Sequence, residues 1–373
     1  MSFCTTDIKV FDLKKLNEYI TSFKDKNIVL ILTDEGIERW KLTDSIKALR
    51  ERNNVTYWGE DIKNPTQVDI AKILNMINSE QIDLILVIGG GSLIDLAKSV
   101  SAVFAFKGGK NITPEEISDI IVNKKYLNNN SYIDIIAIPT TAGTGSEVTQ
   151  WATVWDYQGI KKYSIDSKGL KPVTAIIVPE LTYTLPKRVV LSTVLDALSH
   201  AVEAFWSVKT NAVIQEVALR AVTLIANNLK NVLLGTNKEY HMKKLCMASL
   251  LAGLAFSQTR TTACHAISYP LTMHYHIPHG IAAIISLPYV LEINKTAVKE
   301  LAEVEEIFHP YGGLQNWLTD VSEGLVKLNL SAYGIGISEI EKIIDECFTP
   351  ERMNNNPVEL NRDDIRNILT NVL

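Results

Sequence analysis

The sequence predicts an α/β domain followed by an all-α domain. In the first half, short apolar and β-branched runs alternate with helical stretches, which is typical of a parallel sheet covered on both faces. After residue 186, apolar residues recur at helical spacing and few strand-like runs remain. The chain has 373 residues, which is long for a single hydrophobic core. We therefore expect two domains, residues 1–186 and 187–373.

Five runs are expected to form the sheet. The strongest is 83–91, DLILVIGGG, because an uninterrupted apolar run ends in glycines. The others are residues 27–33, 55–58, 133–139 and 174–178. Residues 152–166 are expected to form an antiparallel hairpin that turns near Gln158–Gly159. Helical periodicity places helices at residues 37–50, 68–79 and 93–106 of this domain, and at residues 194–206, 212–229, 240–256, 337–348 and 362–373 of the second.

Composition excludes several classes of protein. With 46% hydrophobic and 21% charged residues and a net charge of −5, the chain is not intrinsically disordered. It has no basic block, which argues against nucleic acid as a partner. The apolar runs are shorter than the ~20 residues that span a membrane, and the first residues lack the apolar core of a signal peptide. Four cysteines without a CxxC pair favour a reducing compartment, so we expect a cytoplasmic enzyme.

A glycine-rich turn after the strongest strand is a candidate phosphate site. Gly90, Gly91 and Ser92 precede a helix, whose N-terminus offers free N–H groups and the positive end of its dipole. The spacing is neither GxGxxG nor the GK[ST] of a P-loop. The alternative is a tight turn without a ligand.

A second small-residue loop, residues 139–147, follows the next expected strand. Its threonines Thr140, Thr141 and Thr144 suit a dinucleotide lying across the carboxyl edge of the sheet. The alternative is a flexible connector, but two such loops on neighbouring strands favour a shared ligand.

Asp34 follows the first of the expected strands. A carboxylate there can accept hydrogen bonds from a ribose diol and would repel a 2′-phosphate, which favours NAD(H) over NADP(H). On the sequence alone, an N-cap of the next helix is an equally good interpretation.

Four side chains of the second domain are candidate metal ligands. Asp196 and His200 are four residues apart in a helical stretch and so share a face, while His265 and His279 follow later. One carboxylate and three imidazoles can hold a divalent ion, either Fe²⁺ or Zn²⁺. A solvated helix pair explains the Asp-x-x-x-His spacing at least as often.

Four motifs together resemble the iron-containing alcohol dehydrogenases. They are GGGSLIDLAK (89–98), PTTAGTGSEVT (139–149), DALSHAVE (196–203) and HAISYPLTMHYHIPHG (265–280). The resemblance spans roughly residues 25–290 and implies a Rossmann-like nucleotide-binding domain, a helical metal-binding domain and an active site in the cleft between them, as in dehydroquinate synthase-like folds. It also suggests a homodimer.

The resemblance assigns roles to individual residues. It implies that Asp196, His200, His265 and His279 bind the metal. It places the pyrophosphate on Gly90, Gly91 and Ser92 with Asp95 nearby, and the adenine and ribose along Thr140, Thr141 and Thr144. Asn64 matches a cofactor contact, and Lys162 looks like the family lysine that contacts the nicotinamide ribose.

One departure concerns proton transfer. Many members of the family carry a histidine four residues after the third ligand, where this chain has Tyr269. The phenol of Tyr269 is a candidate to position the substrate, and a chain of metal-bound water is the alternative route for the proton.

A narrower resemblance concerns the substrate. Residues 150–156 and 259–262 look like the phosphonoacetaldehyde reductase branch of the family. Arg260, followed by Thr261 and Thr262, offers a forked cation and two hydroxyls, which suits a phosphonate. The alternative is that Arg260 caps a helix or pairs with a surface carboxylate.

The predicted activity is therefore NAD(H)-dependent reduction of a small anionic aldehyde, with phosphonoacetaldehyde as the most specific prediction. Three alternatives remain open at this point. They are a reductase or dehydrogenase of uncharged short alcohols or diols, a lyase similar to dehydroquinate synthase, and a non-catalytic nucleotide-binding protein.

Overall fold

The computed structural model describes residues 5–78, 81–156, 159 and 161–373. These residues form two compact units. The first comprises residues up to Thr141 together with Ser146–Thr182, and the second comprises Ala142–Gly145 and Tyr183–Leu373. The chain therefore enters the second unit for four residues, returns to the first, and leaves it after Thr182. The boundary predicted at residue 186 did not include this excursion, which places Thr144 in the second unit.

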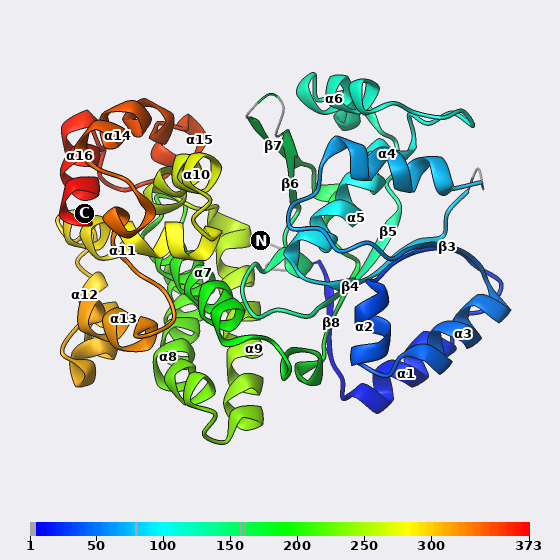
Figure 1. Ribbon diagram of the computed structural model, residues 1–373, viewed down its shortest axis with the longest axis horizontal. Helices are drawn as coiled ribbons and strands as arrows, with labels where there is room; N and C mark the ends of the chain where they lie inside the picture. Colours follow the sequence, from blue (N-terminus) through cyan, green and yellow to red (C-terminus); the bar gives the residue numbers. More distant parts are fainter. Residues whose placement is uncertain (1–4, 79–80, 157–158, 160) are drawn as a thin grey trace. The chain divides into compact units, whose positions relative to one another are not determined.

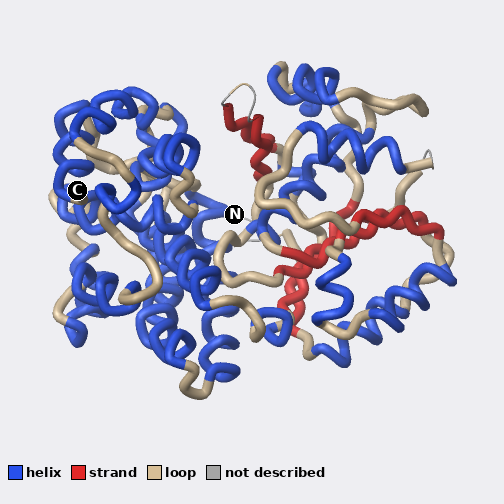
Figure 2. Tube along the Cα trace, viewed as in Figure 1, coloured by secondary structure: helices blue, strands red, loops and turns tan. Residues whose placement is uncertain are grey.

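Unit 1 is built on a parallel sheet, drawn in red in Figure 2. In its described residues the sheet has six strands in the order β1-β8-β5-β4-β2-β3, and all neighbouring pairs are parallel. The strands are β1 (Asp7–Val10), β2 (Asn27–Ile31), β3 (Asn54–Trp58), β4 (Leu84–Gly89), β5 (Asp134–Pro139) and β8 (Thr174–Ile177). A separate antiparallel hairpin pairs β6 (Trp151–Asp156) with β7 (Lys161–Asp166). The five predicted strands and the hairpin are confirmed, although Gln158 of its predicted turn lies outside the described residues.

Helices cover both faces of this sheet (Figure 1). One face packs against α1, α2 and α3, and the other against α4, α5 and α6. Each face of the sheet therefore has its own hydrophobic core. Successive strand residues point to opposite faces, so Val29 and Ile31 belong to one core, and Ile28 and Leu30 belong to the other. The bounds are α1 (Leu13–Thr21), α2 (Asp34–Arg39), α3 (Thr43–Arg52), α4 (Gln67–Met76), α5 (Gly91–Phe104) and α6 (Pro114–Val122).

The single helix predicted at residues 37–50 is wrong. Lys41 adopts a φ of 54°, which a right-handed helix does not accommodate, and the segment divides there into α2 and α3. The short strand β1 was not predicted, because four residues at the sheet edge with exposed ends carry little apolar signal.

The described residues of unit 2 form helices joined by loops, with no strand among them. The helices are α7 (Lys187–Trp206), α8 (Ala212–Leu234), α9 (Lys238–Thr259), α10 (Ala263–Tyr275), α11 (His279–Asn294), α12 (Leu301–Phe308), α13 (Leu314–Ser322), α14 (Ile337–Ile343), α15 (Pro350–Met353) and α16 (Arg362–Asn371). The predicted α/β plus all-α fold is confirmed. Helices α7 and α8 are long and apolar enough to cross a membrane by length and composition, but 83% and 56% of their apolar windows are buried inside the protein.

Two glycines fasten residues 142–145 to the helices of unit 2. A Cβ on Gly143 would lie 2.4 Å from the carbonyl oxygen of Thr193 in α7, and a Cβ on Gly145 would lie 2.6 Å from Cα of Gly253 in α9. Gly145 also has a φ of +60°, which favours glycine. Close backbone contact therefore holds this part of the predicted nucleotide loop in unit 2.

Candidate functional site

Helix α7 presents three ionisable side chains along one face. Asp196, His200 and Glu203 follow one another at spacings of four and three residues, which brings side chains to the same side of a helix. Their exposed fractions are only 4%, 6% and 0%. Ionisable groups are this deeply buried when they are paired with one another or bind a metal.

Two further imidazoles reach this face from α10 and α11. His265 Nε2 lies 3.5 Å from Asp196 Oδ1, and the His265 ring stacks on the ring of His200 with centroids 4.5 Å apart. His200 Nε2 lies 4.0 Å from the same oxygen. One ligand atom each from Asp196, His265 and His279 fall within 4.8 Å of one another. The structure thus brings three of the predicted metal ligands into one group, with the fourth, His200, beside Asp196 and His265.

Gly280 allows α11 to begin against α7. A Cβ at this position would lie 1.9 Å from the carbonyl oxygen of Ser192 and 2.9 Å from Cβ of Asp196. Only glycine permits so close an approach, and it sets the preceding residue, His279, beside Asp196.

The donor set fits a divalent metal ion. Asp196 Oδ1 and His265 Nε2 are buried and have no hydrogen-bond partner among the described residues. Such orphaned polar atoms cost free energy unless a ligand satisfies them. Ligand atoms about 2.1 Å from a tetrahedral ion are roughly 3.4 Å apart, which is close to the 3.5 Å between these two atoms. Carboxylate and imidazole suit iron and zinc alike.

The charges of the cluster favour a cation at its centre. Burial would raise the pKa of Asp196, but the imidazoles of His200 and His265 lower it below its usual range. Burial, only partly opposed by Asp196, lowers the pKa of His200 to about 4. Burial would also lower the pKa of His265, but Glu203 and Asp196 raise it to about 9. A divalent ion bound here would displace the proton that His265 otherwise keeps.

Glu203 was not predicted, although it closes the DALSHAVE motif. Its carboxylate accepts a hydrogen bond from His265 Nδ1, the ring nitrogen away from Asp196. It also accepts from the backbone N–H and the hydroxyl of Thr262, at 2.9 and 2.8 Å. A carboxylate behind a ligating imidazole fixes the tautomer and the ring orientation. The spacing of seven residues from Asp196 was the available signal, because it places both side chains on one helix face.

Thr262 does not have the role that the sequence suggested. Its hydroxyl donates to Glu203 and accepts from Trp206 Nε1 at 2.8 Å, and the residue is fully buried. It supports the imidazole of His265 instead of offering a hydroxyl to an anion.

Arg260 ends α9 and forms an ion pair with Glu351, its Nη1 lying 3.3 Å from the carboxylate. This is the surface pairing that the sequence left open as an alternative. Its predicted role at the anionic end of the substrate stays a prediction.

Tyr269 lies beside the metal ligands. Its ring is parallel to that of His279, with an angle of 1° and centroids 6.0 Å apart. Burial raises the pKa of the phenol, against the opposing charge of Arg352. The hydroxyl is therefore protonated at neutral pH and can donate a hydrogen bond.

In unit 1 the first predicted nucleotide loop lies beside Thr140 and Thr141, which begin the second loop and belong to the same unit. Gly90 is the N-cap of α5, which begins at Gly91 without a side-chain cap, so its first N–H groups lack intrahelical partners. Thr140 N–H donates to the carbonyl of Gly89 at 3.0 Å, and a Cβ on Gly90 would meet nothing closer than the Thr141 side chain at 3.5 Å. This arrangement offers an anion site at a helix N-terminus.

The hydroxyl of Ser92 donates to the carbonyl of Lys63 at 2.5 Å, which ties α5 to the segment that holds Asn64. Lys162 lies on β7, and its ammonium is 5.1 Å from the ring centroid of Trp155, its neighbour across the hairpin. Asn64 and Lys162 both belong to unit 1.

Asp95 is held within the protein. It accepts from Ser146 Oγ at 2.6 Å and from the backbone N–H of Thr153 at 2.9 Å. One turn later, the fully buried Lys98 donates to Ser146 Oγ and to the carbonyl of Trp151, both at 2.8 Å. These residues fasten α5 to the segment that follows the second loop. Lys98 is the last residue of the GGGSLIDLAK motif, and its structural role was not predicted from the sequence.

Asp34 is the first residue of α2 and is not its N-cap. Thr33 caps the helix, its hydroxyl accepting from Gly36 N–H at 3.1 Å. Asp34 is exposed instead, and its carboxylate accepts a hydrogen bond from the Tyr57 hydroxyl at 2.5 Å. The capping interpretation is therefore wrong. The Asp34 carboxylate is instead oriented by the hydroxyl of Tyr57, a residue of β3.

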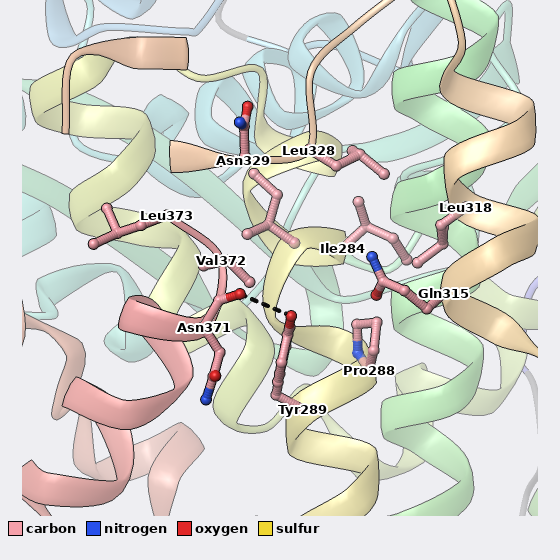
Figure 3. A pocket seen from close by; sticks show the side chains of 11 residues that line it. Ile284, Pro288, Tyr289, Gln315, Leu318, Leu328, Asn329, Asn371, Val372 and Leu373 are labelled. Carbon is pink, nitrogen blue, oxygen red and sulfur yellow. Dashed lines mark hydrogen bonds between the residues drawn. The ribbon is translucent and has the colours of Figure 1, made fainter. Parts of the chain in front are cut away.

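Unit 2 contains a cavity whose lining residues are shown in Figure 3. It has a volume of about 180 Å³, and none of its lining residues is a predicted site residue. Ile284, Pro288 and Tyr289 of α11 form one wall, and the chain end from Asn371 to Leu373 forms another.

Comparisons with known proteins match both units. The family model described as iron-containing alcohol dehydrogenase matches residues 9–179, and that of the C-terminal part of the same family matches residues 190–373. Alcohol dehydrogenase 4 of Saccharomyces cerevisiae is 28% identical over 363 residues, covering 95% of this chain and 92% of that protein. Long-chain-alcohol dehydrogenase 1 of Geobacillus thermodenitrificans is 30% identical over 363 residues, covering 91% and 88%.

A solved structure is also similar along the whole chain. Sulfoacetaldehyde reductase from Bifidobacterium kashiwanohense, solved in complex with NAD⁺, has a TM-score of 0.84 and 26% sequence identity. The match covers 99% of this chain and 97% of that one.

Proposed function

The chain belongs to the iron-containing alcohol dehydrogenase family, and from that premise we propose that it reduces a short anionic aldehyde, specifically phosphonoacetaldehyde to 2-hydroxyethylphosphonate. The family is that of iron-containing alcohol dehydrogenases, and the proteins similar to this chain include one solved with NAD⁺ and one named as NADPH-dependent. The observation that carries the substrate class is the similarity to a sulfoacetaldehyde reductase. Sulfonate and phosphonate are both tetrahedral oxyanions one CH₂ away from the carbonyl, so the two substrates share size, shape and the sign of their charge.

Asp196, His200, His265 and His279 would hold the divalent ion, which supplies Lewis acidity at the carbonyl oxygen. Glu203, which accepts a hydrogen bond from His265 Nδ1, would keep Nε2 of the same ring directed toward the ion. The nicotinamide supplies the hydride. Tyr269, whose raised pKa keeps its proton at neutral pH, would donate a hydrogen bond that orients the substrate.

The anionic end of the substrate would be recognised by cations of unit 2. Arg260 follows the last turn of α9, and its partner Glu351 has an exposed side chain (63%). A surface ion pair of this kind contributes only about 0–1 kcal/mol, so a dianionic phosphonate can compete with Glu351 for the guanidinium.

NAD(H) over NADP(H) is part of the proposal, with Gly90, Gly91 and Ser92 at the pyrophosphate and Asp34 at the ribose. A homodimer and a cytoplasmic location are also part of the proposal. Cys264 and Cys347 are free thiols, which fits a reducing compartment.

A second candidate function is the oxidation of uncharged short alcohols or diols, or the reduction of the corresponding aldehydes. The yeast relative favours it, since it is an alcohol dehydrogenase without a stated anionic substrate, and the Geobacillus relative is named for uncharged alcohols of long chain.

An NADH-oxidation screen separates these functions. Purified protein loaded with Fe²⁺ or Zn²⁺ is assayed with phosphonoacetaldehyde, sulfoacetaldehyde, acetaldehyde and a sugar phosphate. The proposal expects kcat/KM for phosphonoacetaldehyde to exceed that for acetaldehyde by at least an order of magnitude. Equal values would overturn the anionic substrate, and turnover of the sugar phosphate without net NADH loss would indicate a lyase.

A further inference from the structure

We propose that Arg352 binds the charged group of the substrate. The inference rests on the proposed function, because it names a residue that would recognise an anionic aldehyde. Arg352 belongs to α15, which packs against α10, the helix that carries His265 and Tyr269 (Figure 1). It lies in none of the sequence motifs.

Arg352 lies one aromatic ring away from the candidate metal centre. Its guanidinium carbon is 4.6 Å from the ring centroid of Tyr269, and that ring lies parallel to His279 at 6.0 Å. In a two-carbon aldehyde, a single CH₂ separates the carbonyl from the phosphonate or sulfonate. A substrate whose carbonyl end lies near His279 therefore needs a cation in that neighbourhood, and Arg352 contacts the aromatic ring that lies beside His279.

The guanidinium has unsatisfied capacity. Its Nε is buried and has no hydrogen-bond partner among the described residues. The neighbouring carboxylate, Glu351, pairs with Arg260 instead. A buried N–H without an acceptor costs free energy unless a ligand provides one.

Tyr269 supports this cation without consuming its donors. A cation above an aromatic ring is held through the ring face, while the N–H groups at the edge of the planar guanidinium stay directed outward. Two parallel N–H groups match two oxygens of a phosphonate or sulfonate. Tyr269 would thus be a positioning residue for Arg352 as well as a neighbour of the metal ligand His279.

The test compares Arg352→Met and Arg352→Lys with the wild-type holoenzyme. For each protein, kcat/KM is measured with phosphonoacetaldehyde, sulfoacetaldehyde and acetaldehyde. Loss of hydrogen bonds to a charged group lowers the ratio of anionic to neutral kcat/KM by about 10- to 100-fold in Arg352→Met. Arg352→Lys keeps the positive charge but loses the two parallel N–H groups. Its ratio of anionic to neutral kcat/KM is therefore expected to fall between those of wild type and Arg352→Met. Arg366→Met is the matched control, because Arg366 is an arginine of α16 bonded to Glu341 on the surface.

Each outcome decides the matter. Equal losses on anionic and neutral aldehydes would overturn the proposal, because a residue that only supports Tyr269 would affect both. An unchanged ratio in a wild-type background that prefers the anion would overturn Arg352 alone. A wild type without that preference would overturn the proposed substrate class and this inference with it. If Arg352→Met does not fold, the test uses Arg352→Lys and its inhibition by methylphosphonate. The proposal expects a larger inhibition constant for Arg352→Lys than for wild type, and an equal constant would overturn it.

Discussion

Glu203 lies directly behind His265, and its carboxylate accepts a hydrogen bond from the ring nitrogen opposite the one that faces Asp196. Four hydrogen bonds converge on this one buried side chain, two of them from Thr262 and two from His265. The position of His265 is therefore fixed by residues that the metal would never touch.

Replacing Glu203 with Gln is expected to weaken metal binding by about 10- to 100-fold, because the amide no longer orients and polarises His265. The measurement is metal content after dialysis, together with the dissociation constant for Zn²⁺. Glu239→Gln, at an exposed site at the start of α9, is the control. Unchanged metal affinity in Glu203→Gln would show that His265 is oriented without this carboxylate.

Replacing Gly280 with Ala is expected to lower both stability and metal content. The added methyl group would lie 1.9 Å from the Ser192 carbonyl oxygen, and relieving such an overlap costs about 1–3 kcal/mol. Because α11 must move away from α7, His279 moves away from Asp196. Thermal melting and metal analysis measure the two effects. Gly90→Ala is the control for stability, since its methyl meets no atom closer than 3.5 Å.

Lys98 is expected to make stability depend on pH in a defined window. Burial, partly opposed by Asp95, lowers its pKa to about 8 from 10.5. Between these values the unfolded chain binds a proton that the folded protein has released, so the contribution of Lys98 to stability rises with pH from about 8 to 10.5. Its slope approaches about 1.4 kcal/mol per pH unit.

The check is the free energy of unfolding from urea titrations at pH 8, 9 and 10. Lys98→Gln retains a donor but does not titrate, so the difference in stability between wild type and variant should grow with pH across this range. A constant difference would show that Lys98 titrates at its ordinary pKa. Lys72→Gln, at an exposed residue of α4, controls for the loss of a surface lysine.

Asp34→Ser is expected to reduce the preference for NADH over NADPH by about an order of magnitude, because a carboxylate at the ribose repels a 2′-phosphate. The measurement is kcat/KM for each cofactor at saturating aldehyde. Glu35→Ser removes the neighbouring exposed carboxylate and serves as the control. A ratio that changes equally in both variants would point to general surface charge instead of contact with the ribose.

The sequence predicted the parts of this molecule whose signals are local. Continuous apolar runs identified the inner strands, because strands buried on both faces need apolar residues at every position. The division between α2 and α3 depends on the positive φ of Lys41, which apolar periodicity does not register. The motifs predicted Asp196, His200, His265 and His279 as ligands. In the structure, ligand atoms of Asp196, His265 and His279 lie within 4.8 Å of one another, and His200 Nε2 lies 4.0 Å from Asp196 Oδ1.

Other features depend on packing between distant segments. Arg352 follows Tyr269 by more than eighty residues, and only the contact of α15 with α10 joins them. Asp95 could be assigned to the nucleotide from its motif, yet its partners Ser146 and Thr153 lie on a segment about fifty residues later. Thr262 looked like an available hydroxyl because its partners, Glu203 and Trp206, come from another helix.

Residues 142–145 give the chain an unusual relationship to its own domains. The polypeptide passes between the two units at Thr141, at Gly145 and again at Thr182. A single proteolytic cut after Thr182 would leave the amino-terminal fragment still carrying a short peptide that packs through Gly143 and Gly145 onto α7 and α9. The cut would therefore divide the second unit between the two fragments. Either fragment expressed alone would lack part of its native packing.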